Sequence, residues 1–370
     1  MFVAAVVALS LPAFIRALAG ATSDSSHFDV LDYIDPLIGT SNGDVSLCVD
    51  SLLGHVFPGA SLPYGMAKAV ADVNKEVQGG FSSGDGEITG FSHMHDSGTG
   101  GGASLGNFPL FPQTGCEGGI LNNCYFPKTT RASQRVNETI KVRPGYFAVS
   151  MNTSIHTEMT VTNHTALYRF TFPTDGTPTK RSGDGAQHKM PYSPLILADL
   201  TDLSNSRSNG SIEVNPKTGR IAGFGTFNPS FGIGSYNAFF CADFSGGKIR
   251  DTGVFINNRA GSEPKSLKLP NDGNTVPGGA WVQFHPPDSN QIKARVGLSF
   301  MSTDQACRNA ELELPDFNFE KVRTAAEDTW RDKLDVVKVN ASGVSKTLQR
   351  TFWSGIYRTL ISPQDYTGMS

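Results

Sequence analysis

The chain has little charge and no excess of either sign. Asp, Glu, Lys and Arg make up 18% of its 370 residues, and the net charge is −3 at pH 7. Proteins that bind nucleic acid or anionic membranes electrostatically carry an excess or clusters of Lys and Arg. The chain also lacks a run of about 20 apolar residues, the length that a membrane-spanning helix needs. We therefore expect neither a nucleic-acid partner nor a membrane anchor.

Motifs for nucleotides and zinc are missing or incomplete. No Gly-Lys-Ser/Thr segment is present, so a phosphate-binding loop of the Walker type is not expected. No Cys-x-x-Cys pair is present, so a zinc ribbon lacks its ligands. Residues 98–103 fit Gly-x-Gly-x-x-Ala, but a polar His-rich segment precedes them where a dinucleotide-binding fold needs an apolar strand.

The N-terminus has the pattern of a signal peptide. Residues 2–15 form an apolar run that is too short to span a bilayer, and Ala-Leu-Ala at 17–19 matches a cleavage site. One departure is that no Lys or Arg precedes the run, and the alternative is a buried N-terminal segment. We expect a signal peptide at residues 1–21 and a secreted, extracellular protein.

Sequons and cysteines agree with secretion. The chain has Asn-x-Ser/Thr sequons at Asn137, Asn152, Asn163, Asn209 and Asn340, which predict a glycoprotein. Its cysteines are five, an odd number. Cys116 and Cys124 flank a Gly- and Asn-rich loop and could close it as a disulfide. The pattern leaves the pairing of the other three open, namely Cys48, Cys241 and Cys307.

The body of the chain predicts β-structure. Glycine (40 residues) and proline (21) are frequent, which favours turns and short strands over long helices. Apolar residues alternate with polar ones in several segments, the pattern of a sheet with one buried face. The expected strands are residues 146–151, 155–161, 167–172, 195–200, 236–244, 281–285 and 292–300. Many short strands separated by turns indicate a sandwich.

The period changes to helical after about residue 305. Apolar residues at three- and four-residue steps predict a helix over 319–334, with Asp316 as its cap. A second amphipathic helix covers 344–360 and stops at Pro363. The sequence offers this second helix no later segment to cover its apolar side. We expect the chain to be cut off at the entrance to a helical domain.

Two stretches around the first third of the chain carry the candidate site. Residues 54–66 and 90–102 join aromatic, imidazole and hydroxyl groups to glycines and prolines. That mix is costly in helices and strands and suits fixed loops that hold polar groups over a site. Aromatic faces and fixed polar groups are what sugar recognition needs. The candidate substrate-binding residues are His55, Gly59, His93, His95 and Asp96.

A metal site and a complete catalytic pair are not evident. His93 and His95 could bind a metal, but third and fourth zinc ligands are not apparent, and we assign no metal ligand. Glycosidic cleavage needs two carboxyl groups flanking the bond. The carboxylates in or near the two stretches are Asp44, Asp50, Asp72, Asp85, Glu87 and Asp96. Their spacing singles out no pair, and we assign no catalytic residue.

The chain resembles the N-terminal part of family 92 of the glycoside hydrolases. The likeness begins at residues 35–40 and continues through 54–66 (GHVFPGASLPYGM) and 88–100 (ITGFSHMHDSGTG). It extends through shorter segments to WRDKL at 330–334 and FWSGIYRTL at 352–360. Ordered motifs therefore cover nearly the whole mature chain.

The resemblance implies a secreted exo-α-mannosidase that inverts the anomeric centre and requires Ca²⁺. In this family, a Glu acid, an Asp base and most calcium ligands belong to a C-terminal helical domain beyond this chain. We therefore expect the chain alone to be inactive. Its expected partners are α-mannoside glycans, of the N-glycan or mannan type, and the missing helical domain. A non-catalytic carbohydrate-binding β-sandwich is the alternative function.

The implied fold is mainly β. It is a large antiparallel β-sandwich of the galactose-mutarotase-like supersandwich type, followed by a linker helix and the first helix of a truncated (α/α) barrel. After the signal peptide, we expect an N-terminal β-sandwich domain of family 92 at 22–304. A linker-helix region follows at 305–340, and the start of the truncated helical catalytic domain at 341–370.

Overall fold

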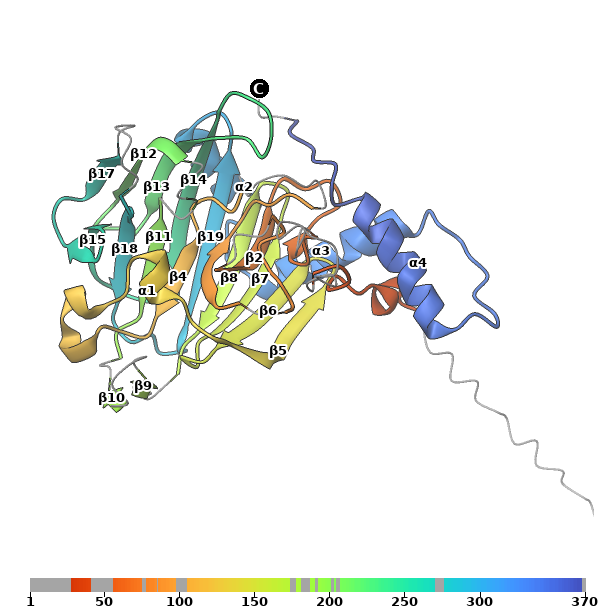
Figure 1. Cartoon of the computed structure of the whole chain (residues 1–370), viewed down its shortest axis with the longest axis horizontal. Helices are drawn as coiled ribbons and strands as arrows, with labels where there is room; N and C mark the ends of the chain where they lie inside the picture. The colour runs from red at the N-terminus through yellow and green to blue at the C-terminus, as the bar shows by residue number, and fades with distance from the viewer. Residues whose placement is uncertain are drawn as a thin grey trace, which may run out of the picture.

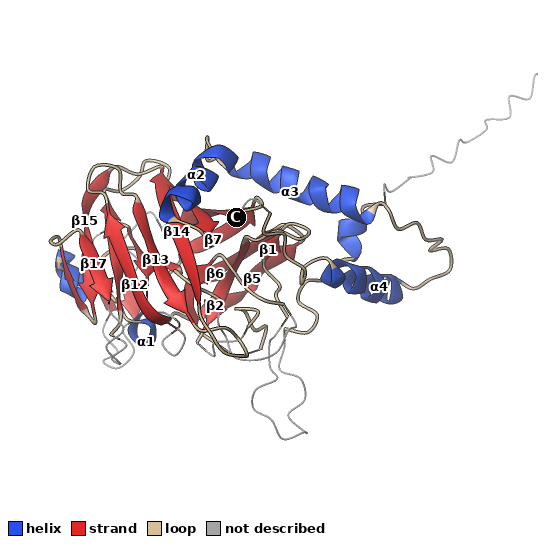
Figure 2. Ribbon diagram, turned by 90° about the horizontal axis from the view of Figure 1, so that it is seen from above, coloured by secondary structure: helices blue, strands red, loops and turns tan. Residues whose placement is uncertain are grey.

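The computed structural model describes residues 28–40, 56–74, 78–84, 86–97, 105–173, 178–180, 187–189, 192–200, 203, 207–269 and 276–367. These stretches form two large antiparallel sheets, with helices along one face and at one end (Figure 1 and Figure 2). The prediction of a mainly β fold with helices after a sandwich is confirmed. The expected signal peptide lies outside the described residues.

Each sheet is a set of short strands that pair with antiparallel neighbours. In spatial order, the eight-stranded sheet contains β1 (Ala60–Ser61), β2 (Lys68–Val73), β3 (Ile88–Ser92), β4 (Leu110–Gln113), β11 (Leu195–Asp199), β18 (Gly278–Phe284), β15 (Ile249–Ile256) and β16 (Arg259–Gly261). The nine-stranded sheet contains β17 (Ser266–Leu269), β12 (Arg207–Val214), β13 (Ile221–Phe227), β14 (Tyr236–Ser245), β19 (Gln291–Ser299), β8 (Thr165–Thr171), β7 (His156–Val161), β6 (Tyr146–Met151) and β5 (Arg135–Arg143). A separate ribbon pairs β9 (Pro178–Lys180) with β10 (Gln187–Lys189).

Alternating side chains build an aromatic core between the sheets. On β8, Tyr168 and Phe170 are buried and their rings stack, whereas Arg169 between them makes ion pairs on the other face. Phe91 of β3 reaches across from the first sheet, with its ring 6.0 Å from that of Phe170. The seven strands expected from the sequence are all present.

Strands also run into the stretches that we expected to be loops. Residues 88–92 are β3, and residues 60–61 are the short strand β1. Gly90 fits within β3 because a Cβ there would lie 2.5 Å from the Cβ of Pro109. Gly90 is thus needed for close packing against Pro109 and not for a turn. The residue type alone does not distinguish these two roles.

Three longer helices follow the sandwich. They are α2 (Thr303–Glu313), α3 (Phe319–Leu334) and α4 (Lys346–Thr359). The predicted helix at 319–334 is confirmed, but its cap is Asn318, whose side chain accepts a hydrogen bond from the backbone N–H of Lys321. Asp316 lies two residues earlier, and its carboxylate accepts a hydrogen bond from the backbone N–H of Asn318 instead. The shorter elements are η1 (Val30–Tyr33), η2 (Glu117–Gly119), η3 (Leu121–Asn123) and α1 (Lys128–Arg131).

Two disulfides are present. Cys116 bonds to Cys124, as expected, and closes the loop that carries η2 and η3. Cys241 of β14 bonds to Cys307 of α2, a pair separated by 66 residues that the sequence pattern could not identify. This second bond ties α2 to the nine-stranded sheet.

A glycine lets α2 rest directly on that sheet. Gly297 of β19 lies opposite Cys241 in the strand pairing, so the two residues share a face of the sheet. A Cβ at Gly297 would lie 2.0 Å from the carbonyl oxygen of Ala306. The helix therefore approaches the backbone of β19 as closely as it does because no side chain intervenes.

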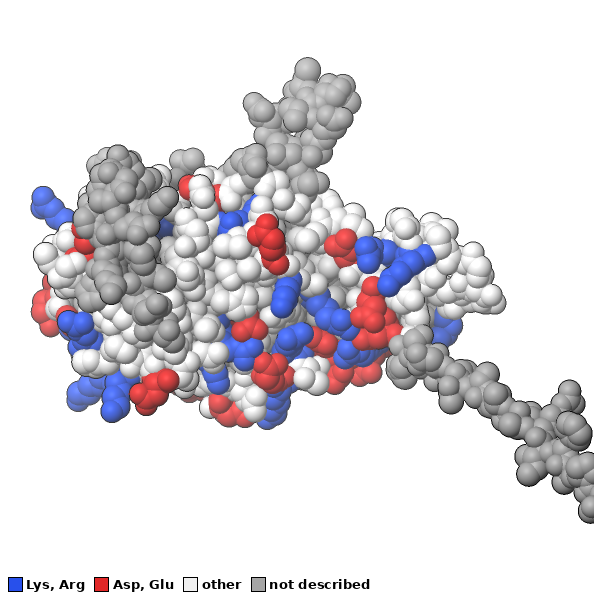
Figure 3. All heavy atoms as spheres, turned by 90° about the horizontal axis from the view of Figure 1, so that it is seen from below, with Lys and Arg blue, Asp and Glu red and all other residues white. Residues whose placement is uncertain are grey.

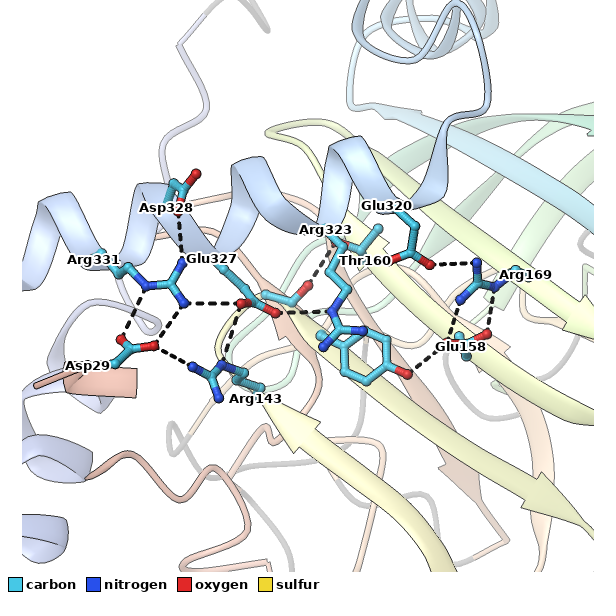
Figure 4. A network of polar contacts seen from close by, with 12 residues as sticks. Asp29, Arg143, Glu158, Thr160, Arg169, Glu320, Arg323, Glu327, Asp328 and Arg331 are labelled. Carbon is cyan, nitrogen blue, oxygen red and sulfur yellow. Dashed lines mark hydrogen bonds and ion pairs between the residues drawn. The ribbon is translucent and has the colours of Figure 1, made fainter. Parts of the chain in front are cut away.

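An ion-pair network fastens α3 along the same sheet (Figure 4). Arg169 of β8 contacts both carboxylate oxygens of Glu158 at 2.6 and 2.7 Å, and Glu320 of α3 at 2.7 Å. Further along, Asp29 pairs with Arg143 of β5 and Arg331 of α3. Burial acts to raise the pKa of Glu158, but hydrogen bonds from Arg169 and Tyr146 outweigh it and lower that pKa.

The helix α4 lies beside η1 at one end of the sandwich (Figure 1). Ser354 of α4 accepts a hydrogen bond from the backbone N–H of Asp35 at 2.9 Å. Arg358 donates to the carbonyl oxygens of Pro36 and Ile38. The first and last described parts of the chain are therefore joined here.

The surface has mixed charge. On the face shown in Figure 3, acidic and basic side chains are interspersed along the lower edge, and neither sign forms a continuous patch. Among the described residues, no helix is long and apolar enough to cross a membrane.

We expect Gly297→Ala to destabilise the protein by about 3 kcal/mol, because the added Cβ forces α2 away from β19. Gly355→Ala is the matched control. Gly355 is exposed within α4 with nothing within 4 Å of an added Cβ, so alanine should stabilise the helix by about 1 kcal/mol. Chemical denaturation measures both changes. Equal effects from the two substitutions would contradict the packing of α2.

We expect the stabilising effect of Glu158 to be lost in acid. Its folded pKa lies below the ordinary Glu value of 4.5, so its charge stabilises the fold above about pH 4.5 and this stability is lost as the pH falls through the folded pKa. Glu158→Gln should lower the melting temperature at pH 7, and the difference from the unmodified protein should shrink toward pH 3. The exposed Glu263→Gln is the control and should change little. A Glu158→Gln difference that stays constant from pH 7 to 3 would refute this assignment.

Candidate functional site

The two predicted stretches meet on the outer face of the eight-stranded sheet. Residues in register across two strands share a face, and Ala71 of β2 pairs with Phe91, which points to the other sheet. The alternate residues Lys68 and Asp72 therefore face away from that sheet. They are nevertheless buried, because the stretches around 57 and 95 cover them.

His95 pins the second stretch onto β2. Its Nδ1 donates to the carbonyl oxygen of Gln78 at 2.9 Å. Its Nε2 lies 2.6 Å from the Ser92 hydroxyl and 2.9 Å from Asp72 Oδ1. The Asp72 contact is a hydrogen bond when Nε2 also carries a proton, since a carboxylate only accepts. The ring is buried, with Phe57 of the first stretch stacked 5.8 Å away.

Glycines make this close covering possible. A Cβ at Gly59 would lie 2.2 Å from the carbonyl oxygen of Ala69, and one at Gly80 would lie 2.7 Å from His95 Nε2. Gly80 also has a φ of +78°, which L side chains rarely adopt. The structure places Gly59 in the packing against β2, where it positions the loop.

His93 lies in the core. It has 0% exposure, its Nε2 donates to the carbonyl oxygen of Phe108 at 2.9 Å, and its Nδ1 lies 2.6 Å from the Tyr168 hydroxyl. Burial lowers its pKa to about 4, which keeps the ring neutral at pH 7. Because its side chain is fully buried, His93 has no surface that a ligand could contact. Its hydrogen bonds link the two sheets. His55 lies outside the described residues.

The serine and histidine groups do not form a hydrolase triad. Residues 80–84 match Gly-x-Ser-x-Gly, but Ser82 is buried in the loop between β2 and β3, and a nucleophile elbow requires a turn from strand to helix. Ser92, His95 and Asp72 have the residue types of a triad. However, Ser92 and Asp72 contact the same ring nitrogen, whereas a triad places them on opposite nitrogens. The geometry does not support acyl transfer.

Asp96 is the predicted site residue that reaches a pocket. The pocket has a volume of about 360 Å³ and lies between the second stretch, the loop after β13 and the segment after α4. Its lining consists of Asp96, Leu105, Pro229, Ser230, Phe231, Tyr236, Phe300 and Tyr366. Ser230 donates to Asp96 Oδ2 at 3.2 Å. Asp96 is the one acidic side chain in this lining as far as the chain is described, so the pocket lacks the second carboxyl group that glycosidic cleavage needs.

Lys68 is a buried cation beneath the second stretch. Its amine has no hydrogen-bond partner among the described residues. Burial lowers its pKa to about 7, and the negative charge of Asp96 opposes that shift. No sequence pattern singles out Lys68, because its burial depends on loops that come from elsewhere in the chain.

The helices after the sandwich contact the first stretch directly. The indole N–H of Trp330 donates to the carbonyl oxygen of Ser61 at 2.7 Å, and its ring lies 4.5 Å from that of Tyr357. The backbone N–H of Tyr64 donates to Leu360, and that of Asp365 donates back to Tyr64. The motifs that are widely separated in the sequence thus meet at one junction.

The same segment also contacts the second stretch, where the Ser362 hydroxyl donates to the carbonyl oxygen of Ser97 at 2.8 Å. Sequence reasoning missed the pocket residues Ser230, Phe231, Tyr236, Phe300 and Tyr366. For Ser230 and Phe231 there was one sequence signal, the glycine-rich loop at 228–235. This loop lies between two strands and carries exposed aromatic and apolar side chains.

The described residues do not fit a calcium or zinc site. No three His, Cys, Asp or Glu side chains in this part of the chain come together in a way that could hold a metal ion. His93 and His95 also face different partners, the first in the core and the second on β2. We derive no chemical step through a metal from these residues.

Family models match almost all of the chain after residue 32. The Glycosyl hydrolase family 92 N-terminal domain matches residues 33–299, and the Glycosyl hydrolase family 92 catalytic domain matches residues 305–370. A curated relative from Arthroderma benhamiae, described as an uncharacterized secreted glycosidase, is 50% identical over 347 residues. The match covers 92% of this chain and 42% of the relative, so the chain spans less than half of the relative's length.

Solved structures share the fold. The family 92 glycosyl hydrolase ccman5 matches with a TM-score of 0.73 and 21% identity, over 92% of this chain and 42% of its own. A family 92 α-mannosidase from Bacteroides thetaiotaomicron matches with a TM-score of 0.70 and 20% identity, over 90% and 41%. Because the first family model alone covers more than half of the 370 residues, the chain belongs to glycosyl hydrolase family 92.

Proposed function

We propose that the chain is the N-terminal, sugar-facing part of a secreted, calcium-dependent, inverting exo-α-mannosidase that acts on N-glycan or mannan α-mannosides. Family membership supports a glycosidase. Among the structural neighbours, one from Bacteroides thetaiotaomicron is described as an inverting mannosidase, and an α-mannosidase from the same organism is described in complex with mannoimidazole. Their substrate class is our proposal for this chain.

The Asp96 pocket carries this proposal. Asp96 comes from the sandwich, and Tyr366 comes from the region that matches the catalytic domain. A site between the two regions therefore begins to form within this chain. Its mixture of aromatic rings and one carboxylate suits a sugar, which has apolar ring faces and many hydroxyl groups.

The predicted site residues take two roles in this proposal. Asp96 contacts the sugar, whereas Gly59, His93 and His95 hold the loops that present it. His55 lies outside the described residues. Its predicted role in substrate binding therefore stays part of this proposal. In this proposal, the calcium ligands and the acid–base pair belong to the part of the helical domain outside this chain.

Secretion is supported by oxidised cysteines and accessible sequons. Disulfides persist in oxidising compartments and are rare in the cytosol. Four sequon asparagines are exposed, namely Asn137, Asn152, Asn163 and Asn340. Asn209 is half-buried on β12 and is the poorest acceptor on steric grounds.

A carbohydrate-binding sandwich without catalysis is the second candidate. The pocket has a single carboxylate, whereas glycosidic cleavage needs two. This favours a non-catalytic function for the isolated chain. The apolar side of α4 favours the first candidate, because Leu348 is 61% exposed and Phe352 and Val344 are also exposed. A groove of about 700 Å³ next to α4, lined by Phe28 and Trp353 among others, adds to this uncovered surface. Exposed apolar surface of this kind indicates a missing packing partner.

A chimera tests the enzyme function. In the Arthroderma benhamiae relative, this chain replaces the matching N-terminal 42% of the length. We expect calcium-dependent release of mannose from α-mannobiose, with β-mannose as the first product by NMR, and no release by the 370-residue chain alone. A folded but inactive chimera, beside a parent that releases mannose, would refute the proposal. Robust calcium-dependent release by the chain alone would place the acid and base within it.

Sedimentation of the isolated chain tests the uncovered side of α4. We expect concentration-dependent self-association, and Leu348→Ser with Phe352→Ser should reduce it because the pair removes most of the exposed apolar stripe. Leu312→Ser on α2 is the control, since Leu312 is 73% exposed but lies outside α4. A fully monomeric chain at high concentration would instead favour the self-sufficient sandwich.

A further inference from the structure

We propose that Asn137 is N-glycosylated and that its glycan shields the free edge of the nine-stranded sheet from pairing with other chains. The sequon occupies residues 137–139 of β5. The inference rests on the secretion proposed above, because N-linked glycans are found on surface segments of secreted proteins.

The strand β5 is the longest free edge of the two large sheets. It pairs with β6 on one side, and no strand in the described part of the chain pairs with its other side. The other edge strands, β1, β16 and β17, have two, three and four residues, whereas β5 has nine. None of these nine residues is buried, and β5 is the outermost strand of its sheet in Figure 1. Unpaired N–H and C=O groups on a long edge are a template for strands of other chains, which proteins normally block.

A bulge carries the sequon out of the strand ladder. The pairing with β6 slips between Val136 and Lys141, so four residues of β5 lie opposite one residue of β6. The Thr139 hydroxyl holds this bulge, because it donates to the carbonyl oxygen of Val136 at 2.6 Å and accepts from the backbone N–H of Ser150 at 2.8 Å. Asn137 lies within the bulge and is exposed. Bulges at sheet edges redirect side chains or end the pairing.

An anchored arginine orients the Asn137 amide. Arg135 Nε donates to Asn137 Oδ1 at 2.9 Å, and the same guanidinium donates to the carbonyl oxygens of Ser82 and Gly84. It also lies over the Phe81 ring, 4.7 Å from the ring centroid. With Oδ1 held in this way, Asn137 Nδ2, the atom that carries an N-linked glycan, has no hydrogen bond in the described part of the chain.

The other sequons do not lie on a free edge. Asn152 and Asn163 lie in the turns before and after β7, and Asn340 lies between α3 and α4. Asn209 lies on β12, which has a strand on each side. Asn137 is therefore the sequon at which a bulky, solubilising glycan covers unpaired strand groups.

Charged side chains are the competing means of protection, since they also keep edges apart. Arg135 and Arg143 at the two ends of β5 are engaged, the first with backbone carbonyls and the second with Asp29. The exposed charges that remain are Glu138 and Lys141, which have opposite signs. In an antiparallel pair of two copies, Glu138 of one copy can face Lys141 of the other, which favours association. We therefore favour the glycan as the shield.

Secretion of the 370-residue chain from a eukaryotic host tests the shield. The chain carries Leu348→Ser and Phe352→Ser, so that α4 does not drive association. We expect glycopeptide mass spectrometry to find a glycan on Asn137. Asn137→Gln should make the chain aggregate several-fold faster on warming, with thioflavin T binding, because strands then add to β5. Removing the glycans from the folded chain with an endoglycosidase should do the same, which separates shielding from an effect on folding.

Asn340→Gln is the matched control. It removes an exposed sequon outside any sheet and should leave the aggregation rate unchanged. Asn137→Lys should restore resistance without a glycan, because lysine on an edge opposes pairing.

Two results would overturn the inference and leave the secretion standing. One is an Asn137 without glycan on a secreted chain whose other sequons are occupied, and the other is equal aggregation rates for Asn137→Gln and Asn340→Gln. A chain that the host does not export, with no glycan on any sequon, would overturn both the inference and the secretion.

Discussion

The close approach of two loops to β2 is the constraint on which the candidate site depends. Gly59 and Gly80 allow this approach because a Cβ at either position would overlap neighbouring atoms. The loops then enclose His95, whose ring nitrogens bind Gln78, Ser92 and Asp72. A buried hydrogen-bonded group is costly to move, since breaking its bonds leaves unsatisfied polar atoms. Asp96 follows His95 directly and is presented to the pocket for that reason.

The helical junction completes the pocket from the other side. Trp330 binds the carbonyl oxygen of Ser61 and packs on Tyr357, so α3 and α4 are both fixed against the first stretch. The segment after α4 then runs back over Tyr64 and places Tyr366 beside Asp96. The sandwich and the beginning of the catalytic region are therefore packed against each other. The ion pairs along α3 in Figure 4 fix the position of that helix on the sandwich.

The sequence indicated two stretches that approach the pocket, but not which of their side chains line it. Of the proposed substrate-binding residues, Asp96 reaches the pocket, while His93, His95 and Gly59 are buried around it. A sequence shows that imidazoles are close together, but it does not show which side of a strand each one faces. His93 and His95 both follow the end of β3, but they contact different partners. Phe231 was missed because it comes from a loop whose neighbour in space is about 130 residues away in the chain.

The sequence by itself determined seven of the strands, the helices α3 and α4, the family resemblance and the short-range disulfide at Cys116. These features depend on local periodicity, ordered motifs or short spacing, which can be read along the chain. Only the tertiary structure decided the Cys241–Cys307 bond, the seat of α2 on Gly297, the burial of Lys68 and the membership of the pocket. Each of these depends on the distance between residues far apart in sequence, and that distance is set by how the two sheets and the helices pack.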